Sequence, residues 1–230
     1  YFYFSYYFIK WYWYNNKTDT DTTWAGLVDF LYYFNQTAAS PDGVKIFDET
    51  ANNWFNMDRN MLFLMVEAYL MAGDQFDSGN NYNLYHNHDT SGEVPKEQRL
   101  LFYYDIDECL HFNDDGTNED DTDVIHFYDT DINKYEDYNP ITTLLFNSTK
   151  YTKIYMQNLA FMLNAIYKSN QAPTERARSI YNFVLPWVAK DRNWQMSTNM
   201  TTEKFMASAE QVISYLNVRY EDVMKQVQPY

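Results

Sequence analysis

The sequence contains one cysteine, Cys109, which excludes an intrachain disulfide and a cysteine-based metal cluster. It contains no secretory signal pattern and no apolar run of the roughly 18 to 20 residues that a spanning helix needs. We therefore expect any membrane span to lie mostly upstream of Tyr1. Cations are scarce too: 17 Lys and Arg against 32 Asp and Glu give a net charge of −15. This argues against nucleic acid as a partner, because phosphate binding needs clustered cations.

Motifs of common enzyme chemistry are also missing. The sequence has no G-x-S-x-G, no P-loop, no dinucleotide-binding fingerprint and no H-E-x-x-H zinc motif. Because the sequence has 32 acidic side chains, a pair of carboxylates can be chosen almost anywhere, so such a pair does not indicate an acid–base catalytic site. We therefore expect no intrinsic catalytic activity.

Aromatic residues are abundant, with 23 Tyr, 16 Phe and 6 Trp. A hydrophobic fraction of 46% is typical of a globular chain. Because Tyr and Trp combine a large apolar surface with a polar tip, their excess favours interfaces over a core built only for packing. Charge is uneven: residues 1–140 hold 26 acidic and 7 basic side chains, whereas residues 141–230 hold 6 and 10. The two regions are therefore expected to face different surroundings or to dock on each other.

The first fourteen residues, YFYFSYYFIKWYWY, include eleven aromatic ones. A segment this apolar must be shielded from water, and three environments can do this: the edge of a membrane, a partner protein or the chain's own core. Lys10 and the exit sequence WYWYNNK favour the membrane edge, where Tyr and Trp gather and lysine reaches the headgroups. The residues expected at a membrane or partner interface are Tyr7, Phe8, Lys10, Trp11, Tyr12, Trp13 and Tyr14.

Apolar periodicity predicts a mainly α protein with a helical bundle in the C-terminal third. The middle is expected to be acidic and loop-rich, with at most a short β element, and the N-terminal segment aromatic. The three predicted regions are residues 1–17, 18–139 and 140–230. Helices are expected over 150–169, 174–190 and 202–227, and their short connections indicate an antiparallel three-helix bundle.

The helix predicted over 174–190 carries a set of apolar residues assigned to one packed face. They are Ala177, Ile180, Tyr181, Val184, Trp187 and Val188. Upstream, the pattern predicts a helix over 24–34, a turn at 40–43, and a long helix from 53 to 72 stopped by Gly73. Residues 74–96 are expected to form a loop, followed by a helix after Pro95 that places Phe102, Ile106, Cys109 and Leu110 on one face. Residues 124–128 are the one expected strand.

Two residue groups suggest metal ligands. His86, His88 and Asp89 lie within HNHD, and a His-x-His pair on a strand points both rings to one side, as a transition-metal site needs. The acidic run at 113–123 includes Asp120, Asp121 and Asp123, which suggest an irregular calcium site. An EF-hand is excluded, because His111 and Thr122 stand where its charged first and last ligands belong. No cofactor is predicted, and calcium and a transition metal remain the alternatives.

Runs such as YFYFSYYF, LYYF and LLFYYDID resemble the divergent mitochondrially encoded proteins of protists such as ciliates. The resemblance is one of composition, and it implies a subunit of a respiratory-chain or ATP synthase complex. The resemblance assigns no redox residues to this sequence, because the copper-binding motif of cytochrome oxidase subunit II is absent. It further implies an anchoring aromatic end, with an acidic helical domain outside the bilayer of the mitochondrial inner membrane.

Three functional hypotheses follow from these features. The leading one is a non-catalytic structural subunit of a membrane-associated assembly, with protein subunits and membrane lipid as partners. The second is a secreted or surface-exposed acidic binding domain that uses calcium. The third is a metalloenzyme centred on His86 and His88.

Overall fold

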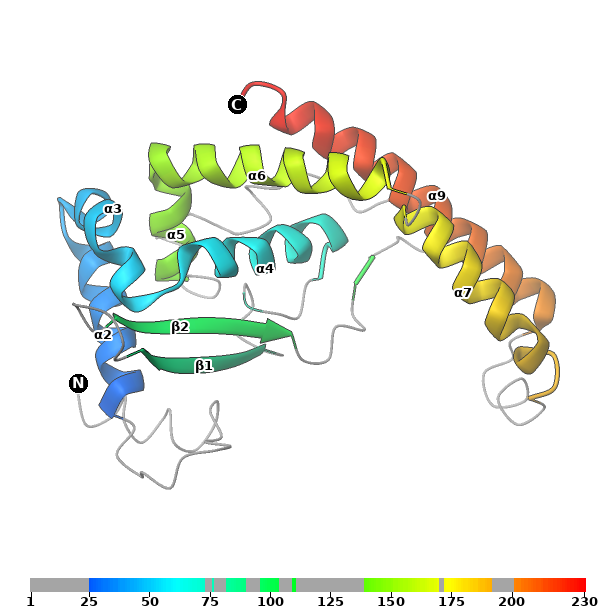
Figure 1. The fold of residues 1–230 in the computed structure, drawn as a ribbon, viewed down its shortest axis with the longest axis horizontal. Coiled ribbons are helices and arrows are strands. Elements are labelled where there is room, and N and C mark those ends of the chain that lie inside the picture. The colour runs from blue at the N-terminus through cyan, green and yellow to red at the C-terminus, as the bar shows by residue number, and fades with distance from the viewer. Residues whose placement is uncertain are drawn as a thin grey trace. The chain divides into compact units, whose positions relative to one another are not determined.

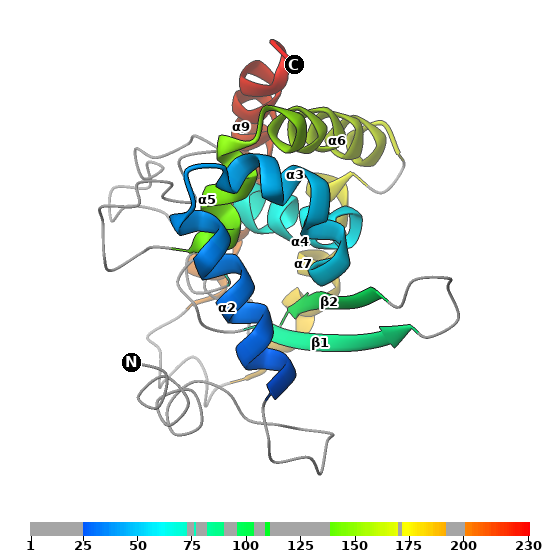
Figure 2. The ribbon, with the colours of Figure 1, turned by 90° about the vertical axis from the view of Figure 1, so that its left-hand side faces the viewer.

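A computed structural model describes much of the chain, and Figures 1 and 2 show it from two sides. The described residues are 25–72, 76, 82–89, 96–103, 109–110, 139–169, 172–191 and 201–230; the side chains of 87–89, 96 and 97 are not among them. The predicted N-terminal aromatic segment, the acidic run at 113–123 and the strand expected at 124–128 lie outside these residues.

The described residues are mainly helical, as predicted, and they include one small sheet. In chain order the elements are α2 (Ala25–Ala39), α3 (Gly43–Trp54), α4 (Met57–Leu70), β1 (Tyr82–Asp89), β2 (Lys96–Tyr103), α5 (Pro140–Asn147), α6 (Thr149–Tyr167), α7 (Pro173–Val188) and α9 (Thr202–Val227). The helices expected in the final third are confirmed as α6, α7 and α9, while their arrangement as a three-helix bundle stays a prediction.

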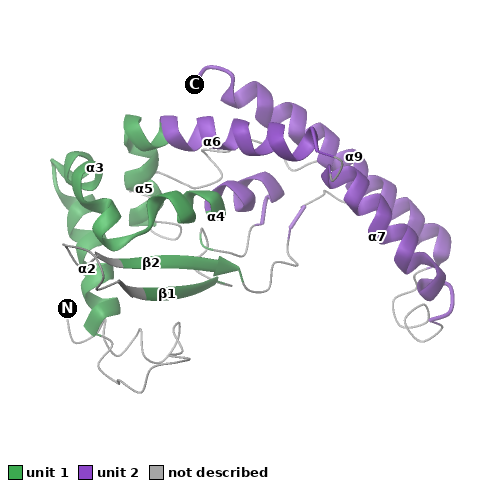
Figure 3. Ribbon diagram, viewed as in Figure 1, with its two compact units in different colours: residues 1–63, 74–106, 128–152 green, residues 64–73, 107–127, 153–230 purple. Residues whose placement is uncertain are grey.

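The chain forms two compact units, coloured separately in Figure 3. Unit 1 comprises Tyr1–Phe63, Asp74–Ile106 and Tyr128–Thr152, and unit 2 comprises Leu64–Gly73, Asp107–Phe127 and Lys153–Tyr230. Helices α4 and α6 each contribute residues to both units.

Aromatic rings form the core of unit 1. Phe34 is fully buried, and its ring centroid lies 4.9 Å from that of Phe30 and 6.2 Å from those of Phe47 and Phe55. Phe47 in turn makes an edge contact with Tyr151 at 5.3 Å. Each such pair adds about 0.5–1.5 kcal/mol to the burial of its area. The abundance of aromatic residues therefore serves packing here as well as interfaces.

Of the loop predicted over 74–96, residues 82–89 form a strand instead, and so do residues 96–103, where a helix was predicted after Pro95. Strands β1 and β2 pair antiparallel over eight residues each, from Tyr82 opposite Tyr103 to Asp89 opposite Lys96. Alternating side chains in β1, such as Leu84 and His86 against Asn83 and Tyr85, provide the two-residue period of a strand. The many asparagines hid that period, because Asn is depleted in strands and common in turns.

The helix predicted from 53 to 72 is confirmed as α4, which begins only at Met57 because strand β2 docks at residues 55 and 56; helix α3, which ends at Trp54, was not predicted. Phe55 has an extended backbone and forms an isolated bridge with Arg99. The Asn56 amide donates to the Arg99 carbonyl at 3.1 Å, and the Asn56 side chain accepts from the Arg59 amide at 3.1 Å. The Asn60 side chain donates to the same Arg99 carbonyl and accepts from the Leu101 amide, at 2.8 Å each. Asn56 therefore ends one helix and starts the next.

Met71, and not the predicted Gly73, terminates helix α4. Met71 has a φ of 50°, in the left-handed region where glycine is usual. Its amide donates to the Ala68 carbonyl at 3.4 Å, and the Ala72 amide donates to the Glu67 carbonyl at 3.1 Å. These two bonds form a Schellman motif. Met71 is buried, so its packing opposes the cost of a conformation that glycine adopts more easily.

Arg219 of α9 occupies the end of α4 within unit 2. Its Nη2 donates to the Ala68 carbonyl at 2.7 Å and its Nε donates to the Tyr69 carbonyl at 3.3 Å. The Leu70 carbonyl accepts from the Leu110 amide at 2.8 Å. Together with the Schellman bonds, every one of the last four carbonyls of α4 has a donor. A cation at this end is favoured because the helix dipole makes it negative.

Gly43 is required by a close backbone approach at the turn between α2 and α3. A Cβ on Gly43 would lie 2.1 Å from the Thr37 carbonyl oxygen, whereas one on Gly26 would first meet the Arg99 Nη2 at 3.3 Å. We expect Gly43→Ala to lower the free energy of unfolding by about 1–3 kcal/mol, because the backbone must shift. Gly26→Ala is the matched control and costs less, since a side-chain terminus can move. Urea unfolding of both variants measures the difference; an equal or smaller loss for Gly43→Ala contradicts this account.

A candidate contact surface on helix α7

Helix α7 exposes three large apolar side chains. Phe183 is 74% exposed, Trp187 64% and Ile180 48%. Their spacing of three and four residues places them on one face of the helix. An exposed apolar patch of this kind marks an interaction site more often than an isolated exposed residue does.

Cations stand at both ends of this apolar face. At 100° per residue, Arg176 falls in the same angular sector as Phe183, and Lys190 follows two residues after the last helical residue, Val188; both cations are exposed. The Lys190 Nζ lies 5.4 Å from the centroid of the Trp187 ring. Glu175 and Asp191 fall at the edges of the sector. We call the set Arg176, Ile180, Phe183, Trp187 and Lys190 the α7 ridge; it is about 21 Å long.

The opposite face of α7 packs on α9, beside which it runs in Figure 1. The rings of Tyr181 and Phe205 meet edge to face at 5.5 Å, and Val188 is buried. At the rim Arg178 forms an ion pair with Glu210 at 2.9 Å. Helix α7 therefore has two apolar faces, one packed on α9 and one exposed as the ridge.

Tyrosines and Arg219 hold α9 in unit 2. The Tyr69 hydroxyl donates to the Tyr167 hydroxyl, which in turn donates to the Leu216 carbonyl at 2.6 Å; the Tyr69 oxygen lies 3.3 Å from the same carbonyl. Tyr167 also stacks on Tyr220 with 4.0 Å between ring centroids. Because α7 rests on α9, this network indirectly supports the ridge.

Burial shifts the titration of this network. It raises the pKa of Tyr69, which is raised further by the hydrogen bond to Tyr167, and it raises the pKa of Tyr167. Burial likewise raises the pKa of Tyr215 to about 12, an effect that nearby Arg219 opposes. For Arg219 burial lowers the pKa, since it disfavours the cation.

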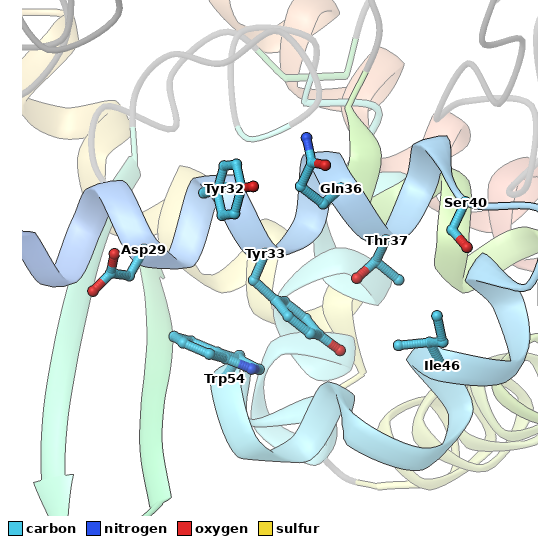
Figure 4. A pocket seen from close by; sticks show the side chains of 8 residues that line it. All are labelled: Asp29, Tyr32, Tyr33, Gln36, Thr37, Ser40, Ile46 and Trp54. Atoms are coloured by element: carbon cyan, nitrogen blue, oxygen red, sulfur yellow. The ribbon is translucent and has the colours of Figure 1, made fainter. Parts of the chain in front are cut away.

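A second feature is a pocket of about 560 Å³ on unit 1, between α2 and α3 (Figure 4). Its lining residues are Asp29, Tyr32, Tyr33, Gln36, Thr37, Ser40, Ile46 and Trp54. Tyr33 and Trp54 lie stacked, with 5.0 Å between ring centroids. The Arg99 guanidinium lies 6.0 Å from the Trp54 ring centroid. Tyr33 and Trp54 are therefore engaged with each other, and Trp54 also with Arg99, which leaves Tyr32, 48% exposed, as the most exposed aromatic ring of the pocket.

The predicted metal ligands are only partly described. His86 lies on β1 opposite Arg99, and its ring is within 3.4 Å of where a Cβ on Gly26 would be. This places the imidazole against α2, next to a cation. His88 and Asp89 belong to β1, but their side chains are outside the described set, as are Asp120, Asp121 and Asp123 entirely. Among the described residues, no three His, Cys, Asp or Glu side chains are grouped to hold a metal ion.

The predicted interface residues Tyr7, Phe8, Lys10, Trp11, Tyr12, Trp13 and Tyr14 also lie outside the described part of the chain. Assigning Ile180 and Trp187 to the packed face of α7 was wrong, because both are exposed. The sequence does hold the signal: Phe183 does not fit the set Ala177, Tyr181, Val184 and Val188, but it does align with Ile180 and Trp187 at helical spacing.

No helix in the described residues combines the length and apolar character needed to cross a membrane. Neither a protein-family model nor a curated protein sequence matches the chain. Any functional argument therefore depends on the chain's own residues.

The raised tyrosine pKa values predict a loss of stability at alkaline pH. Above about pH 10 the unfolded chain releases tyrosine protons that the folded chain retains, so the stabilisation is complete below that pH and falls above it. For Tyr215 the loss ends near pH 12, its folded-state pKa. Each such tyrosine contributes up to about 1.4 kcal/mol per pH unit. Urea unfolding across this range measures the slope; Tyr215→Phe should reduce it, and an unchanged slope would show that Tyr215 titrates alike in both states.

Proposed function

We propose that this chain is a non-catalytic structural subunit of a larger membrane-associated protein assembly, and that the α7 ridge is the surface that holds it there. The observation that carries the proposal is the exposure of Phe183 and Trp187 on one helical face. Trp and other aromatic residues, together with Arg, are enriched where binding energy concentrates. The ridge presents both kinds of side chain in one row.

The magnitude is suitable for anchoring. Complete burial of one large apolar side chain contributes about 1.5–3 kcal/mol. Ile180, Phe183 and Trp187 are roughly half to three quarters exposed, so covering all three yields about 3–5 kcal/mol. That is too little for tight binding alone once the cost of association is subtracted. It suits one contact among several in an assembly.

The proposal has further parts. In unit 2, α6, α7 and α9 act as one antiparallel bundle that supports the ridge, and the aromatic segment at residues 1–17 forms a second attachment. The likeness in composition to protist mitochondrial proteins favours the mitochondrial inner membrane, with a respiratory-chain complex as the assembly. No described feature favours the calcium-binding domain or the metalloenzyme.

The test compares the native chain with Phe183→Ser/Trp187→Ser in the cells that produce it. We expect the native chain to sediment with membranes and migrate as a large species on native gels, and the double variant to leave that species. Tyr85→Ser/Phe102→Ser is the matched control, since it removes two aromatic side chains that are 53% and 51% exposed on the hairpin. It should remain in the complex.

A native chain found only as a soluble monomer would contradict the proposed function. If only the hairpin control leaves the complex, the contact surface is on the β1–β2 sheet and not on α7. Circular dichroism of each variant checks that the helices are intact.

A further inference from the structure

The pocket of unit 1 is lined by one face of α2 and by two residues of α3 (Figure 4). The α2 residues recur every three or four positions, which places them on the same side of the helix. They are Asp29, Tyr32, Tyr33, Gln36, Thr37 and Ser40. Ile46 and Trp54 of α3 complete the lining. The volume of about 560 Å³ lies within the roughly 300–1,000 Å³ of small-molecule sites.

One buried hydroxyl of this pocket has no hydrogen-bond partner in the part of the chain that the structure describes. Thr37 is only 4% exposed; its carbonyl accepts from the Ser40 amide at 3.1 Å, but its hydroxyl makes no such bond. In Figure 4 its side chain points from α2 toward α3, between Tyr33 and Ile46. Buried polar groups in folded proteins are nearly always bonded, so a polar ligand group in the pocket would complete the bonding of Thr37.

Three further lining residues offer hydrogen-bonding groups. Thr50 donates to the Ile46 carbonyl at 2.6 Å, so in its bond with Tyr33 the tyrosine hydroxyl donates, and the Tyr33 oxygen can still accept. The exposed side chains of Asp29 and Gln36 make no hydrogen bond or ion pair with the described residues. Together these groups include both donors and acceptors, which suits a ligand that carries several hydroxyl groups.

Charge favours a neutral ligand. Asp29 is the one charged residue of the lining, so a phosphate group would be repelled and would find no lysine or arginine there. An organic cation would meet Asp29 but also Arg99, whose guanidinium lies 6.0 Å from the Trp54 ring centroid. On α3, Lys45 and Glu49 carry opposite charges and add no net attraction for either sign.

The aromatic residues favour a ligand that packs on one ring. Tyr33 and Trp54 stack on each other at 5.0 Å, so they do not form a slot for a flat aromatic ligand. Tyr32 is the most exposed ring of the lining, at 48%. Asp29 precedes it by three residues and Gln36 follows it by four, so both flank this ring on the same face of α2. A sugar ring has this combination, an apolar C–H face and hydroxyl groups around its edge.

We propose that the α2–α3 pocket binds a neutral carbohydrate. The C–H face of the sugar packs on Tyr32, its hydroxyl groups bond to Asp29 and Gln36, and one of them pairs with the buried Thr37 hydroxyl. This binding site goes beyond the proposed function as a structural subunit. It lies in unit 1 and the α7 ridge lies in unit 2, so either proposal can fail without the other.

The experiment is saturation-transfer difference NMR of the full chain with the methyl glycosides of glucose, galactose, mannose and N-acetylglucosamine. We expect at least one of them to bind with a Kd of about 1–10 mM, because one ring contact and a few hydrogen bonds give modest affinity. Binding should be equal at about 0.15 M and 1 M salt, since the ligand is neutral, and choline should not compete. Retention of the chain on agarose that carries the bound sugar separates a glycan-linked sugar from a free one.

Two variants test the assigned contacts. Tyr32→Ala should weaken binding of that sugar roughly tenfold, by loss of the ring contact. Thr37→Val keeps the size of the side chain and should weaken binding roughly fivefold, by loss of one hydrogen bond. It should not lower the melting temperature, because the hydroxyl has no partner within the fold. Tyr85→Ala is the matched control, since it removes a tyrosine that is 53% exposed on the hairpin, and it should bind as the native chain does.

Absence of binding by all four glycosides would overturn the inference. So would native-like binding by Tyr32→Ala or Thr37→Val, or an equal loss in Tyr85→Ala, since each places the sugar elsewhere. Competition by choline would assign the pocket to cations, and a lower melting temperature of Thr37→Val would show that its hydroxyl is bonded within the fold; both results contradict the proposal. None of these outcomes affects the sedimentation and native-gel test of the proposed function.

Discussion

Each compact unit is organised around a buried arginine whose guanidinium group bonds to backbone carbonyls. Arg219 is fully buried in unit 2 and bonds to the Ala68 and Tyr69 carbonyls at the end of α4. Arg99 is 1% exposed in unit 1, donates to the Gly26 carbonyl of α2, and lies 4.8 Å from the Phe30 ring centroid. A buried cation is tolerated only where donors are satisfied, so each arginine requires its surroundings to be in place.

This constraint explains why distant segments meet in unit 2. The Arg219 guanidinium can be satisfied only if α9 passes the end of α4, and Leu110 completes the same set of carbonyls through its amide. The tyrosine hydroxyls on Leu216 then fix α9 one turn away. One apolar face of helix α7 packs on α9, and the apolar residues of its other face remain exposed as the ridge.

Much of the helical content could be predicted, because α2, α6, α7 and α9 are long and strongly periodic. The hairpin could not, since Asn83 and Asn87 lower the strand propensity of β1, and β2 is set by docking on the α3–α4 junction through Asn56 and Asn60. Likewise Met71 takes a position that local rules reserve for glycine, because tertiary bonds and burial outweigh the preference. Of the candidate contact residues, Ile180 and Trp187 were assigned to the packed face although their spacing with Phe183 marks a second apolar face; the structure shows which of the two faces is exposed.

The central claim, that Arg219 holds the end of α4 against α9, is tested by hydrogen exchange at the amides of Met71, Ala72 and Leu110. In Arg219→Met the two carbonyls lose their cation, at a cost of about 3 kcal/mol, so these amides should exchange roughly a hundredfold faster. The exposed Arg178→Met is the control and should leave them unchanged, and the β1–β2 amides should keep their protection in both variants. Unchanged exchange at Met71, Ala72 and Leu110 in Arg219→Met would contradict the account.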